Sequence, residues 1–343
     1  MNKILITGGC GFIGTNAALH FLKKGYQVIS IDNLSRPGVR NNLDILKQSG
    51  NFINYDIDIA SAEVETIFRK YTPCPVLHLA AQVAVTLSIR DPRKDFSSNA
   101  FGTLNLLEFH RKYNHESAFI NVSTNKVYGK LTGHPVSELG DRYIFADRNF
   151  SAVSEHEPLM FDSPYGCSKG AADQYAIDYA TTFGLKTVTL RQSCIYGKFQ
   201  YGLEDQGWVA WFLISCMLNR TLNIFGTGKQ VRDVLYCDDL IRLYDALVSQ
   251  PESLAGQVYN VGGGANNTLS LLECVREIEE ICEKKVNLQF SDHRKGDQPI
   301  YISDIQSVQS EWGWSPQVNP QNGMQLLFSW LREHKETLKK VLQ

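Results

Sequence analysis

The chain has 343 residues, of which 43% are hydrophobic and 20% are charged, and its formal net charge is −2 at pH 7. This length suits one large domain or two modest ones, and the balanced charge argues against nucleic-acid binding and against an acidic disordered tail. The opening residues MNKILITGG are too short an apolar run for a signal peptide, and no stretch approaches the ~20 apolar residues of a membrane span. We therefore expect a cytoplasmic globular protein that binds neither nucleic acid nor membrane.

The eight cysteines are scattered, and the closest two, Cys274 and Cys282, are eight positions apart. Such spacing forms neither a zinc knuckle nor a CxxC redox pair. We expect free thiols in a reducing compartment and no metal site.

Short apolar runs alternate with helical patterns in the first half of the chain. This alternation indicates βαβ units and a parallel sheet. Strands are expected at 3–9, 26–32, 52–55, 76–80, 118–122 and 185–191, and helices at 12–24, 62–70, 95–113 and 164–183.

After about residue 197 the pattern becomes less regular and richer in glycine and aromatic residues. We expect a Rossmann-type doubly wound parallel sheet over 1–190, and a smaller mixed α/β domain over 191–343 from which some chain crosses back to the first. Further helices are expected at 206–218, 239–249, 269–284 and 322–341, and short strands at 222–225 and 257–260.

The segment GGCGFIG (8–14) lies between the first expected strand and the first expected helix. Gly8, Gly11 and Gly14 let the backbone approach a pyrophosphate, and the helix N-terminus offers amide donors. Asp32 ends the second strand 18 residues after Gly14, near the spacing expected of the ribose partner. Its carboxylate accepts from a 2′-hydroxyl and repels a 2′-phosphate, so the pattern predicts NAD rather than NADP.

Arg36, Asp56 and His78 each allow two interpretations. Arg36 is either a loop residue or one that faces a phosphate, since an arginine here can also accommodate a 2′-phosphate. Asp56, after the third strand, either hydrogen-bonds the adenine or caps the following helix. His78, alone at a strand end, is expected to support the fold or the cofactor loop.

Tyr165 and Lys169 are four positions apart in the helix expected after Pro164, so they share one helix face. A phenol with a pKa of ~10 is a poor base at neutral pH, but a neighbouring ammonium and a cationic nicotinamide ring lower that pKa. The hydroxyl pair Ser123–Thr124 ends the preceding strand. Together these residues predict proton removal from a sugar hydroxyl while a hydride leaves the same carbon.

On these residues the chain resembles the extended short-chain dehydrogenases/reductases along nearly its whole length, and within them the bacterial CDP-tyvelose (CDP-paratose) 2-epimerases. The resemblance implies tightly held NAD, a CDP-linked hexose substrate, and a role in carbohydrate metabolism and lipopolysaccharide biosynthesis. It also implies a homotetramer, or at least a dimer through the helices at 95–113 and 164–183. The motifs that carry it are ITGGCGFIG (6–14), DNLSR (32–36), HLAAQVA (78–84), NAFGTLNLLE (99–108), STNKVYG (123–129), SPYGCSKGAADQY (163–175), DQGWVAWF (205–212) and GKQVRDVL (228–235).

Carried over position by position, the resemblance implies a catalytic set of Thr124, Tyr165 and Lys169. It implies NAD contacts for Gly8, Gly11, Phe12, Ile13, Gly14, Asp32, Asn33, Arg36, Asp56, Ile57, Leu79, Ala80, Ala81, Gln82, Asn99, Ser123, Tyr165 and Lys169. It implies substrate contacts for Gln82, Thr124, Asn125, Gln206, Gly207, Trp208, Val209, Gln230, Arg232 and Arg294.

Two details leave the substrate less defined than the reaction. For Arg232 and Arg294, an exposed salt bridge is the alternative to a pyrophosphate contact. The family's RHSS and DQGWVGWF read RQSC (191–194) and DQGWVAWF (205–212) here, so the sugar stays open among paratose, glucose and other 2-hydroxy hexoses.

Asn125 and Lys126 follow Thr124 where related sugar-nucleotide 4,6-dehydratases carry Asp-Glu. Elimination of water needs an acid and a base, and an amide with an ammonium cannot replace that carboxylate pair. Epimerisation needs only hydride removal, rotation of the ketone and hydride return. The resemblance and this pair together predict epimerisation at C2 without net redox change.

Three alternatives remain. A UDP-hexose 4-epimerase usually carries Ser-Ser-Ala where this chain has Ser123, Thr124 and Asn125. A nucleotide-sugar reductase would exchange NADPH at each turnover, which Asp32 disfavours. A silent NAD-binding regulator has no need for Thr124, Tyr165 and Lys169.

Overall fold

The computed structural model describes residues 2–294 and 296–342, and it divides the chain into two compact units. The first unit consists of Met1–Val127, Ser163–Arg191 and Leu240–Tyr259, and the second of Tyr128–Asp162, Gln192–Asp239 and Asn260–Gln343. The chain passes from the first unit to the second after Arg191, one residue beyond the boundary expected after residue 190. The division differs from the expected domains in that 128–162 lies in the second unit and 240–259 in the first.

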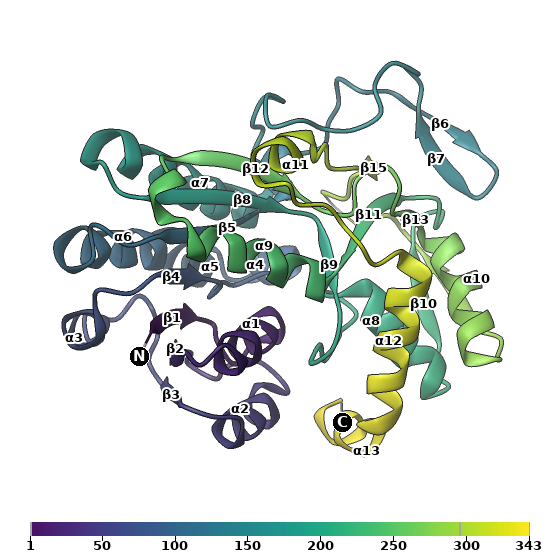
Figure 1. Ribbon diagram of the computed structural model, residues 1–343. Coiled ribbons are helices and arrows are strands. Elements are labelled where there is room, and N and C mark those ends of the chain that lie inside the picture. The colour runs from purple at the N-terminus through teal and green to yellow at the C-terminus, as the bar shows by residue number, and fades with distance from the viewer. Residues whose placement is uncertain (1, 295, 343) are drawn as a thin grey trace. The chain divides into compact units, whose positions relative to one another are not determined.

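A seven-stranded sheet forms the centre of the first unit, in the order β12-β8-β5-β4-β1-β2-β3 (Figure 1). From β5 to β3 the neighbouring strands are parallel, with Lys3 opposite Gln27 and Thr7 opposite His78. Helices cover both faces of the sheet, which confirms the Rossmann-type doubly wound fold. The strands are β1 (Lys3–Thr7), β2 (Gln27–Ile31), β3 (Phe52–Tyr55), β4 (Val76–His78), β5 (Phe119–Thr124), β8 (Thr187–Gln192) and β12 (Gln257–Val261).

The central strands are apolar because helices bury both of their faces. Ile4, Leu5 and Ile6 of β1 are all fully buried. One buried cluster joins β1, β2, β4 and β5 to the helices α3, α6 and α7. The helices are α1 (Phe12–Lys23), α2 (Val39–Gln48), α3 (Val64–Tyr71), α4 (Val85–Arg90), α5 (Pro92–Phe96), α6 (Gly102–Tyr113), α7 (Ser163–Phe183) and α9 (Cys237–Ser249), with short turns η1 (Ser97–Phe101), η2 (Asn125–Tyr128) and η3 (Pro251–Ser253).

The helix expected at 95–113 begins earlier and is interrupted. Pro92 occupies the first turn of α5, and the Asp91 side chain caps that turn by accepting from the Lys94 N–H. The π-helical turn η1 then joins α5 to α6. The sequence pattern missed α2 and α4, since α4 has only six residues and no side-chain cap.

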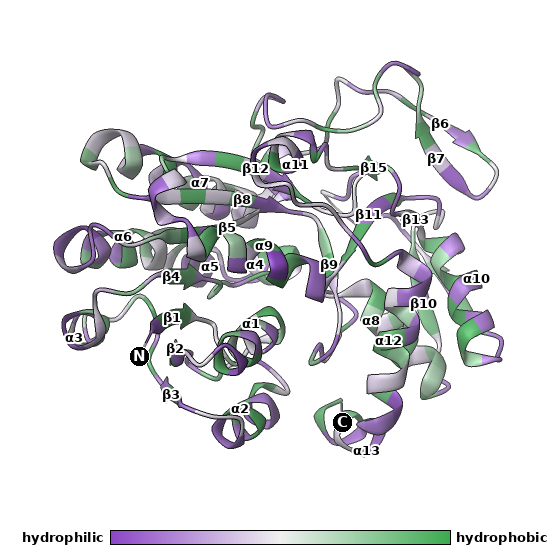
Figure 2. Cartoon of the chain, viewed as in Figure 1, coloured by the Kyte–Doolittle hydropathy of each residue, from purple (hydrophilic) through white to green (hydrophobic). Residues whose placement is uncertain are grey.

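The second unit contains small sheets and an apolar helical layer. Helix α8 is buried on nearly all sides and appears mostly green in Figure 2, and it packs with α10 and α12. A capping box between Ser270 and Glu273 starts α10. The helix expected at 322–341 is two helices, because the chain leaves helical geometry at His334.

The remaining strands of this unit pair over short lengths. β11 lies between β13 and β15 and also pairs with β9, β10 pairs with β14, and β6 with β7 form a hairpin. The elements are β6 (Val136–Leu139), β7 (Arg142–Phe145), β9 (Cys194–Tyr196), α8 (Trp208–Met217), β10 (Leu222–Phe225), β11 (Val231–Tyr236), β13 (Thr268–Ser270), α10 (Leu271–Cys282), β14 (Leu288–Ser291), β15 (Ile300–Tyr301), α11 (Gln306–Trp312), α12 (Pro320–Glu333) and α13 (Lys335–Val341).

Within residues 2–294 and 296–342, no helix combines the length and the hydrophobicity that a bilayer crossing requires.

Candidate active site

The glycine-rich turn links β1 to α1. Gly8 has a φ of +69°, and its carbonyl accepts a hydrogen bond from the Gly11 N–H at 3.0 Å. A Cβ on Gly14 would lie 2.1 Å from the Gly8 oxygen, so only glycine permits this approach. Because the N-cap of α1 is Gly11, no side chain caps the first-turn amides. These amides fit a pyrophosphate.

Asp32 directly follows β2, and its side chain is oriented by two backbone amides. Its Oδ2 accepts from the Cys10 N–H at 3.0 Å, and its Oδ1 accepts from the Leu34 N–H at 2.9 Å. Burial raises the pKa of this carboxyl, and those amides oppose the rise. The Gly11 amide also acts on this carboxylate, whose two oxygens offer about four acceptor positions in all, so one remains for a ribose hydroxyl. The neighbouring Asn33 instead donates to Asp58 Oδ2 at 2.8 Å.

Arg36 is a loop residue that interacts with two residues of the expected site. Burial lowers the pKa of its guanidinium, and the charges of Tyr165 and Asp32 oppose this effect. The guanidinium therefore interacts electrostatically with both groups.

Thr124, Tyr165 and Lys169 lie together in the first unit. Thr124 ends β5, while Tyr165 and Lys169 belong to α7, and all three are buried. The Thr124 hydroxyl favours ionisation of the Tyr165 phenol, against the effect of burial on its pKa. Lys169 Nζ donates to the carbonyl of Val122 at 2.5 Å. The strand end and the first turns of the helix thus bring a hydroxyl, a phenol and an ammonium into one site.

The Lys169 ammonium and a nicotinamide ring are expected to lower the pKa of Tyr165, but in the protein alone this pKa is raised. Burial raises the pKa of Tyr165 to about 12; the Thr124 hydrogen bond and the Arg36 charge oppose the rise, and Asp95 adds to it. Burial also lowers the pKa of Lys169 to about 8, against the charges of Asp173 and Asp95. A phenolate here needs positive charge beyond that of Arg36.

A buried polar network connects the loop after β4 to α7. Asp95 Oδ1 accepts from Gln82 Nε2 at 2.8 Å and from Asn99 Nδ2 at 3.2 Å, and its Oδ2 accepts from Ser168 Oγ at 2.5 Å. The Gln82 side chain also donates to the Ala84 carbonyl and accepts from the Ala84 N–H. The side chain of Gln82 is therefore bonded to protein rather than presented to a ligand.

A second network links three elements behind the catalytic residues. Arg191 of β8 donates to both oxygens of Asp173 on α7, each at 3.0 Å. Ser123 Oγ of β5 donates to Asp173 Oδ2 at 2.7 Å. Asp173 is fully buried and Arg191 is 4% exposed, so the pair is a desolvated, bidentate ion pair.

The loop after β4 is fixed by Thr7 and His78. Thr7 Oγ1 accepts from the N–H groups of Leu79 and Ala80 and shares a hydrogen bond of 2.7 Å with His78 Nδ1. His78 Nε2 bonds Thr103 Oγ1, and burial lowers the pKa of His78 to about 3. A neutral His78 thus supports the segment that includes Ala81.

The helix-capping interpretation of Asp56 is wrong. Helix α3 begins only at Val64, with Glu63 as its N-cap. Asp56 and Ile57 instead lie in the segment after β3, and the Asp56 side chain is exposed. The adenine contact is the interpretation that remains for Asp56.

The arginines expected to bind pyrophosphate lie in the second unit and have protein partners. Arg232, 7% exposed, donates to Asp297 Oδ1 and to the Gln298 carbonyl, both at 2.6 Å. Arg294 is 3.2 Å from Asp205, and its guanidinium lies 4.0 Å from the ring centroid of Phe225. Arg232 is thus not the exposed salt bridge of the alternative interpretation.

Other expected substrate residues surround the start of α8. Gly207, the N-cap of α8, has a φ of +72°, and Gln206 pairs with Leu203 through the backbone. Trp208 Nε1 donates to Cys194 Sγ at 3.3 Å, and Val209 is buried. In the connection between β10 and β11, Gln230 Nε2 donates to the Phe225 carbonyl at 2.6 Å.

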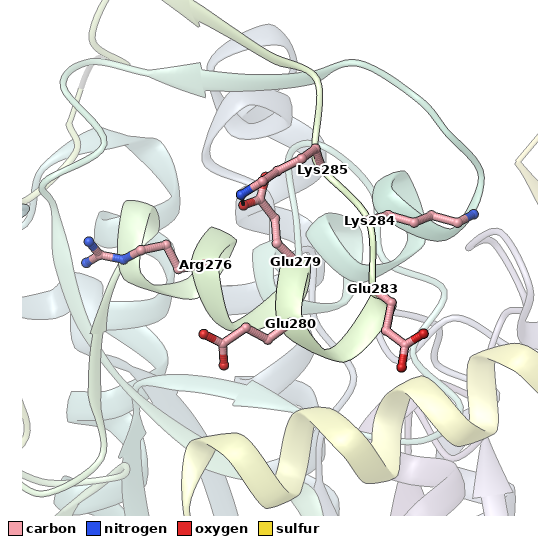
Figure 3. A pocket seen from close by; sticks show the side chains of 6 residues that line it. All are labelled: Arg276, Glu279, Glu280, Glu283, Lys284 and Lys285. Carbon is pink, nitrogen blue, oxygen red and sulfur yellow. Dashed lines mark hydrogen bonds and ion pairs between the residues drawn. The ribbon is translucent and has the colours of Figure 1, made fainter.

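A surface depression of about 410 Å³ lies elsewhere, at the end of α10 (Figure 3). Charged side chains line it, and Lys285 pairs with Glu279 within it. It contains none of the residues expected from the sequence, and we assign it no role. The lining residues are Arg276, Glu279, Glu280, Glu283, Lys284 and Lys285.

None of the eight cysteines forms a disulfide, and no cluster of three or more metal-ligating side chains occurs in the described part of the chain.

Sequence reasoning did not identify Asp95, Ser168, Asp173 or Arg191. Asp95 and Ser168 are 73 positions apart, so no local pattern connects them. Asp173, by contrast, lies four positions after Lys169 on the same helix, and that spacing could have indicated it.

Known proteins resemble this chain over nearly its whole length. The family model described as GDP-mannose 4,6 dehydratase matches residues 5–327. A CDP-paratose 2-epimerase from Salmonella typhi is 43% identical over 334 residues, which cover 96% of this chain and 98% of that protein.

Two solved structures are also similar. A UDP-glucose 4-epimerase with UDP-glucose from Thermotoga maritima has a TM-score of 0.83 at 32% identity, covering 97% of this chain and 99% of that one. A UDP-glucose 4-epimerase complex with NAD from Thermus thermophilus has a TM-score of 0.81 at 29% identity, covering 96% and 99%.

Proposed function

The chain belongs to the family described as GDP-mannose 4,6 dehydratase, and from this premise we propose that it is an NAD-dependent epimerase acting at C2 of a CDP-linked hexose. The similarity to the Salmonella typhi CDP-paratose 2-epimerase supports both the nucleotide and the carbon. CDP-paratose and CDP-glucose are the substrates to test first. The proposal includes the role in lipopolysaccharide sugar synthesis that the resemblance implies.

The observation that carries the proposal is the catalytic set together with the amide residue next to Thr124. The Thr124 hydroxyl acts on the Tyr165 phenol and favours its ionisation, so the two groups can serve one oxygen of a substrate. Asn125 is 5% exposed, and its Oδ1 accepts from Thr124 Oγ1 at 3.4 Å. With an amide at residue 125, the site can transfer a proton at one substrate oxygen. It lacks the Asp-Glu pair that dehydration needs.

The residues of the first unit fit NAD. Gly8, Gly11 and Gly14 leave room where a Cβ would clash, and Asp32 can accept from a ribose hydroxyl. The amides of Phe12 and Ile13, the segment Leu79–Ala81, and Asp56 complete the proposed site, with Asn33, Arg36, Ile57, Gln82, Asn99 and Ser123 around it. When bound, NAD would accept the C2 hydride and return it to the opposite face of the sugar.

The protein's own groups perform the proton transfer. We assign to Tyr165 the removal of the C2 hydroxyl proton and, after the sugar has turned, its return. Thr124 would hydrogen-bond that oxygen, since it ends β5 and its hydroxyl acts on the Tyr165 phenol. Lys169, whose pKa lies at about 8 because of burial, would carry positive charge beside the cofactor ribose at neutral pH.

The second unit would bind the nucleotide. We propose Arg232 and Arg294 as pyrophosphate ligands because a guanidinium offers paired donors to phosphate oxygens. This requires Asp297 and Asp205 to share their arginines with the substrate. Gln206, Gly207, Trp208, Val209 and Gln230 are the proposed sugar and base contacts.

An oligomer is part of the same proposal. Phe96, Phe101 and Tyr175, on α5, η1 and α7, are 59%, 46% and 44% exposed. Aromatic residues are enriched in protein–protein interfaces, so these exposed rings are candidates for one. We propose a dimer through this surface and a tetramer built from dimers; sedimentation at micromolar concentration showing only the 38.6 kDa monomer would refute it.

The test is incubation of purified protein with CDP-glucose or CDP-paratose in D₂O without added cofactor. We expect bound NAD by mass spectrometry and the C2 epimer by NMR without deuterium at C2, because the hydride returns from the same molecule. Deuterium at C2, or strict dependence on NADPH, would contradict the proposal. UDP-glucose serves as the comparison substrate, and its inversion at C4 would favour the 4-epimerase alternative supported by the Thermotoga maritima structure.

A further inference from the structure

Asp95 is a buried carboxylate whose hydrogen-bond partners are all neutral. It is 1% exposed, and its donors are the Gln82 amide, the Asn99 amide and the Ser168 hydroxyl. Among residues 2–294 and 296–342, no lysine, arginine or histidine forms an ion pair with it. A buried carboxylate without a direct ion pair costs stability, so its retention calls for a function.

The partners of Asp95 belong to the active-site elements. Ser168 immediately precedes Lys169, and its hydroxyl lies 3.2 Å from the carbonyl of Tyr165. Asn99 Nδ2 donates to Ser168 Oγ at 3.0 Å, while Asn99 and Gln82 exchange two hydrogen bonds through the Gln82 backbone. Asp95 thus fixes the first turns of α7 against the loop after β4.

We propose, building on the proposed function, that Asp95 is a positioning residue. Its buried negative charge keeps the Tyr165 phenolate from becoming too stable, so that Tyr165 can both take the proton from the sugar and return it. An epimerase must use the same group as base and then as acid within one turnover. A phenolate stabilised too strongly would not give the proton back. Arg36 favours the phenolate, and Asp95 opposes it.

The charged groups facing the pair support this assignment. Around Tyr165 these are Arg36, which lowers its pKa, and Asp95, which raises it. Around Lys169 they are Asp173 and Asp95, which raise its pKa, while burial dominates; Lys169 in turn faces neutral His78. Asp173 forms a direct ion pair with Arg191, whereas Asp95 has no direct ion pair and acts on Tyr165 and Lys169 through space.

The test compares Asp95→Asn, which removes the charge, with Ser168→Ala, which removes a hydrogen bond and keeps the charge. Ultraviolet difference titration of the NAD-loaded protein, with and without Tyr165→Phe in the same background, isolates ionisation of Tyr165 among the tyrosines. We expect Asp95→Asn to move that ionisation to lower pH by about one unit, as removal of a nearby like charge does. Ser168→Ala should leave it unchanged.

In turnover, the pH profile of kcat should move to lower pH as a whole in Asp95→Asn, with both limbs shifted in the same direction. Ser168→Ala should lower kcat without moving either limb. Equal titration curves for Asp95→Asn and the wild type would overturn the proposal. So would failure to fold of both Asp95→Asn and Asp95→Ser, because Asp95 would then serve the fold alone.

The spectroscopic titration needs no substrate. A protein that shows the shift but does not epimerise CDP-sugars would refute the proposed function while leaving the role of Asp95 supported. A protein that epimerises CDP-sugars, but whose Tyr165 ionisation does not move in Asp95→Asn, would support the proposed function and refute the role of Asp95.

Discussion

Two buried carboxylates contact helix α7, and their surroundings differ. Asp173 meets the guanidinium of Arg191 in a bidentate pair, whereas Asp95 is held only by two amides and one hydroxyl. Both are almost fully excluded from solvent. Asp173, paired with Arg191, connects strands β5 and β8 to α7. Asp95 has no direct ion pair and lies near Tyr165, the group to which we assign the proton transfer.

The difference shows where buried charge is tolerated. A paired charge deep in the protein is compatible with a rigid scaffold, because its partner offsets most of the desolvation cost. A charge held by neutral donors is stable only if every acceptor is satisfied, as the three bonds to Asp95 show. Such a charge acts on its neighbours at long range, and here the neighbours are Tyr165 and Lys169.

The largest effect should come from Tyr165, the residue through which Asp95 acts. Tyr165→Phe should lower kcat by about 10²–10⁴-fold, the usual contribution of a positioned acid/base. NAD content should stay near that of the wild type, since the proposed pyrophosphate and ribose contacts are untouched. Turnover of the C2 epimerisation within a few-fold of wild type would show that another group transfers the proton.

Breaking the neutralised pair should cost the most stability. Arg191→Met leaves Asp173 buried without its cation and should lower the free energy of unfolding by about 3–5 kcal/mol. Urea denaturation followed by circular dichroism measures this. The double variant Asp173→Asn with Arg191→Met is the matched control and should recover most of the loss. A single variant as stable as the wild type would remove the basis for the comparison.

The pKa of His78 reports how strongly the interior of the first unit disfavours a buried charge. This pKa is lowered by burial to about 3, against about 6.5 in the unfolded chain. Between these values the unfolded chain binds the proton and the native state does not, so stability falls as the pH falls. From pH 7 to pH 5 His78 should cost about 2 kcal/mol.

The measurement is the difference in unfolding free energy between pH 7 and pH 5, in the wild type and in His78→Gln. The variant should lose about 2 kcal/mol less over this interval, because it has no proton to exclude. Buried His110 has a pKa lowered to about 4 and is present in both proteins, so its contribution cancels. Equal losses would show that His78 is accessible to protons.

The smallest effect on stability should come from an exposed ion pair whose N···O distance is comparable to that of Arg191 and Asp173. Lys24 Nζ lies 2.5 Å from Asp245 Oδ1, with side chains 40% and 27% exposed. Lys24→Met should change the free energy of unfolding by at most about 1 kcal/mol, because water screens the pair. A loss near that of Arg191→Met would show that distance rather than burial decides the value of an ion pair here.

Local patterns in the sequence were sufficient to predict the fold class and the tight glycine turn between β1 and α1. Alternating apolar runs and helical patterns predict a parallel sheet because each buried strand must be followed by a crossover helix. The glycine spacing and Asp32 indicate the nucleotide end of that sheet, since both are local features of one βαβ unit. Tyr165 and Lys169 were identifiable for the same reason, as neighbours on one helix face.

The surroundings of those residues depend on contacts between distant parts of the chain. Asp95 meets Ser168 across 73 positions, and Asp173 meets Arg191 across 18, through packing that no local pattern encodes. The direction of the Tyr165 pKa shift also depended on burial, which sequence reasoning underestimated. Sequence periodicity specifies which face of an element is buried, but electrostatics depends on which charges the folded chain brings together in a medium without water.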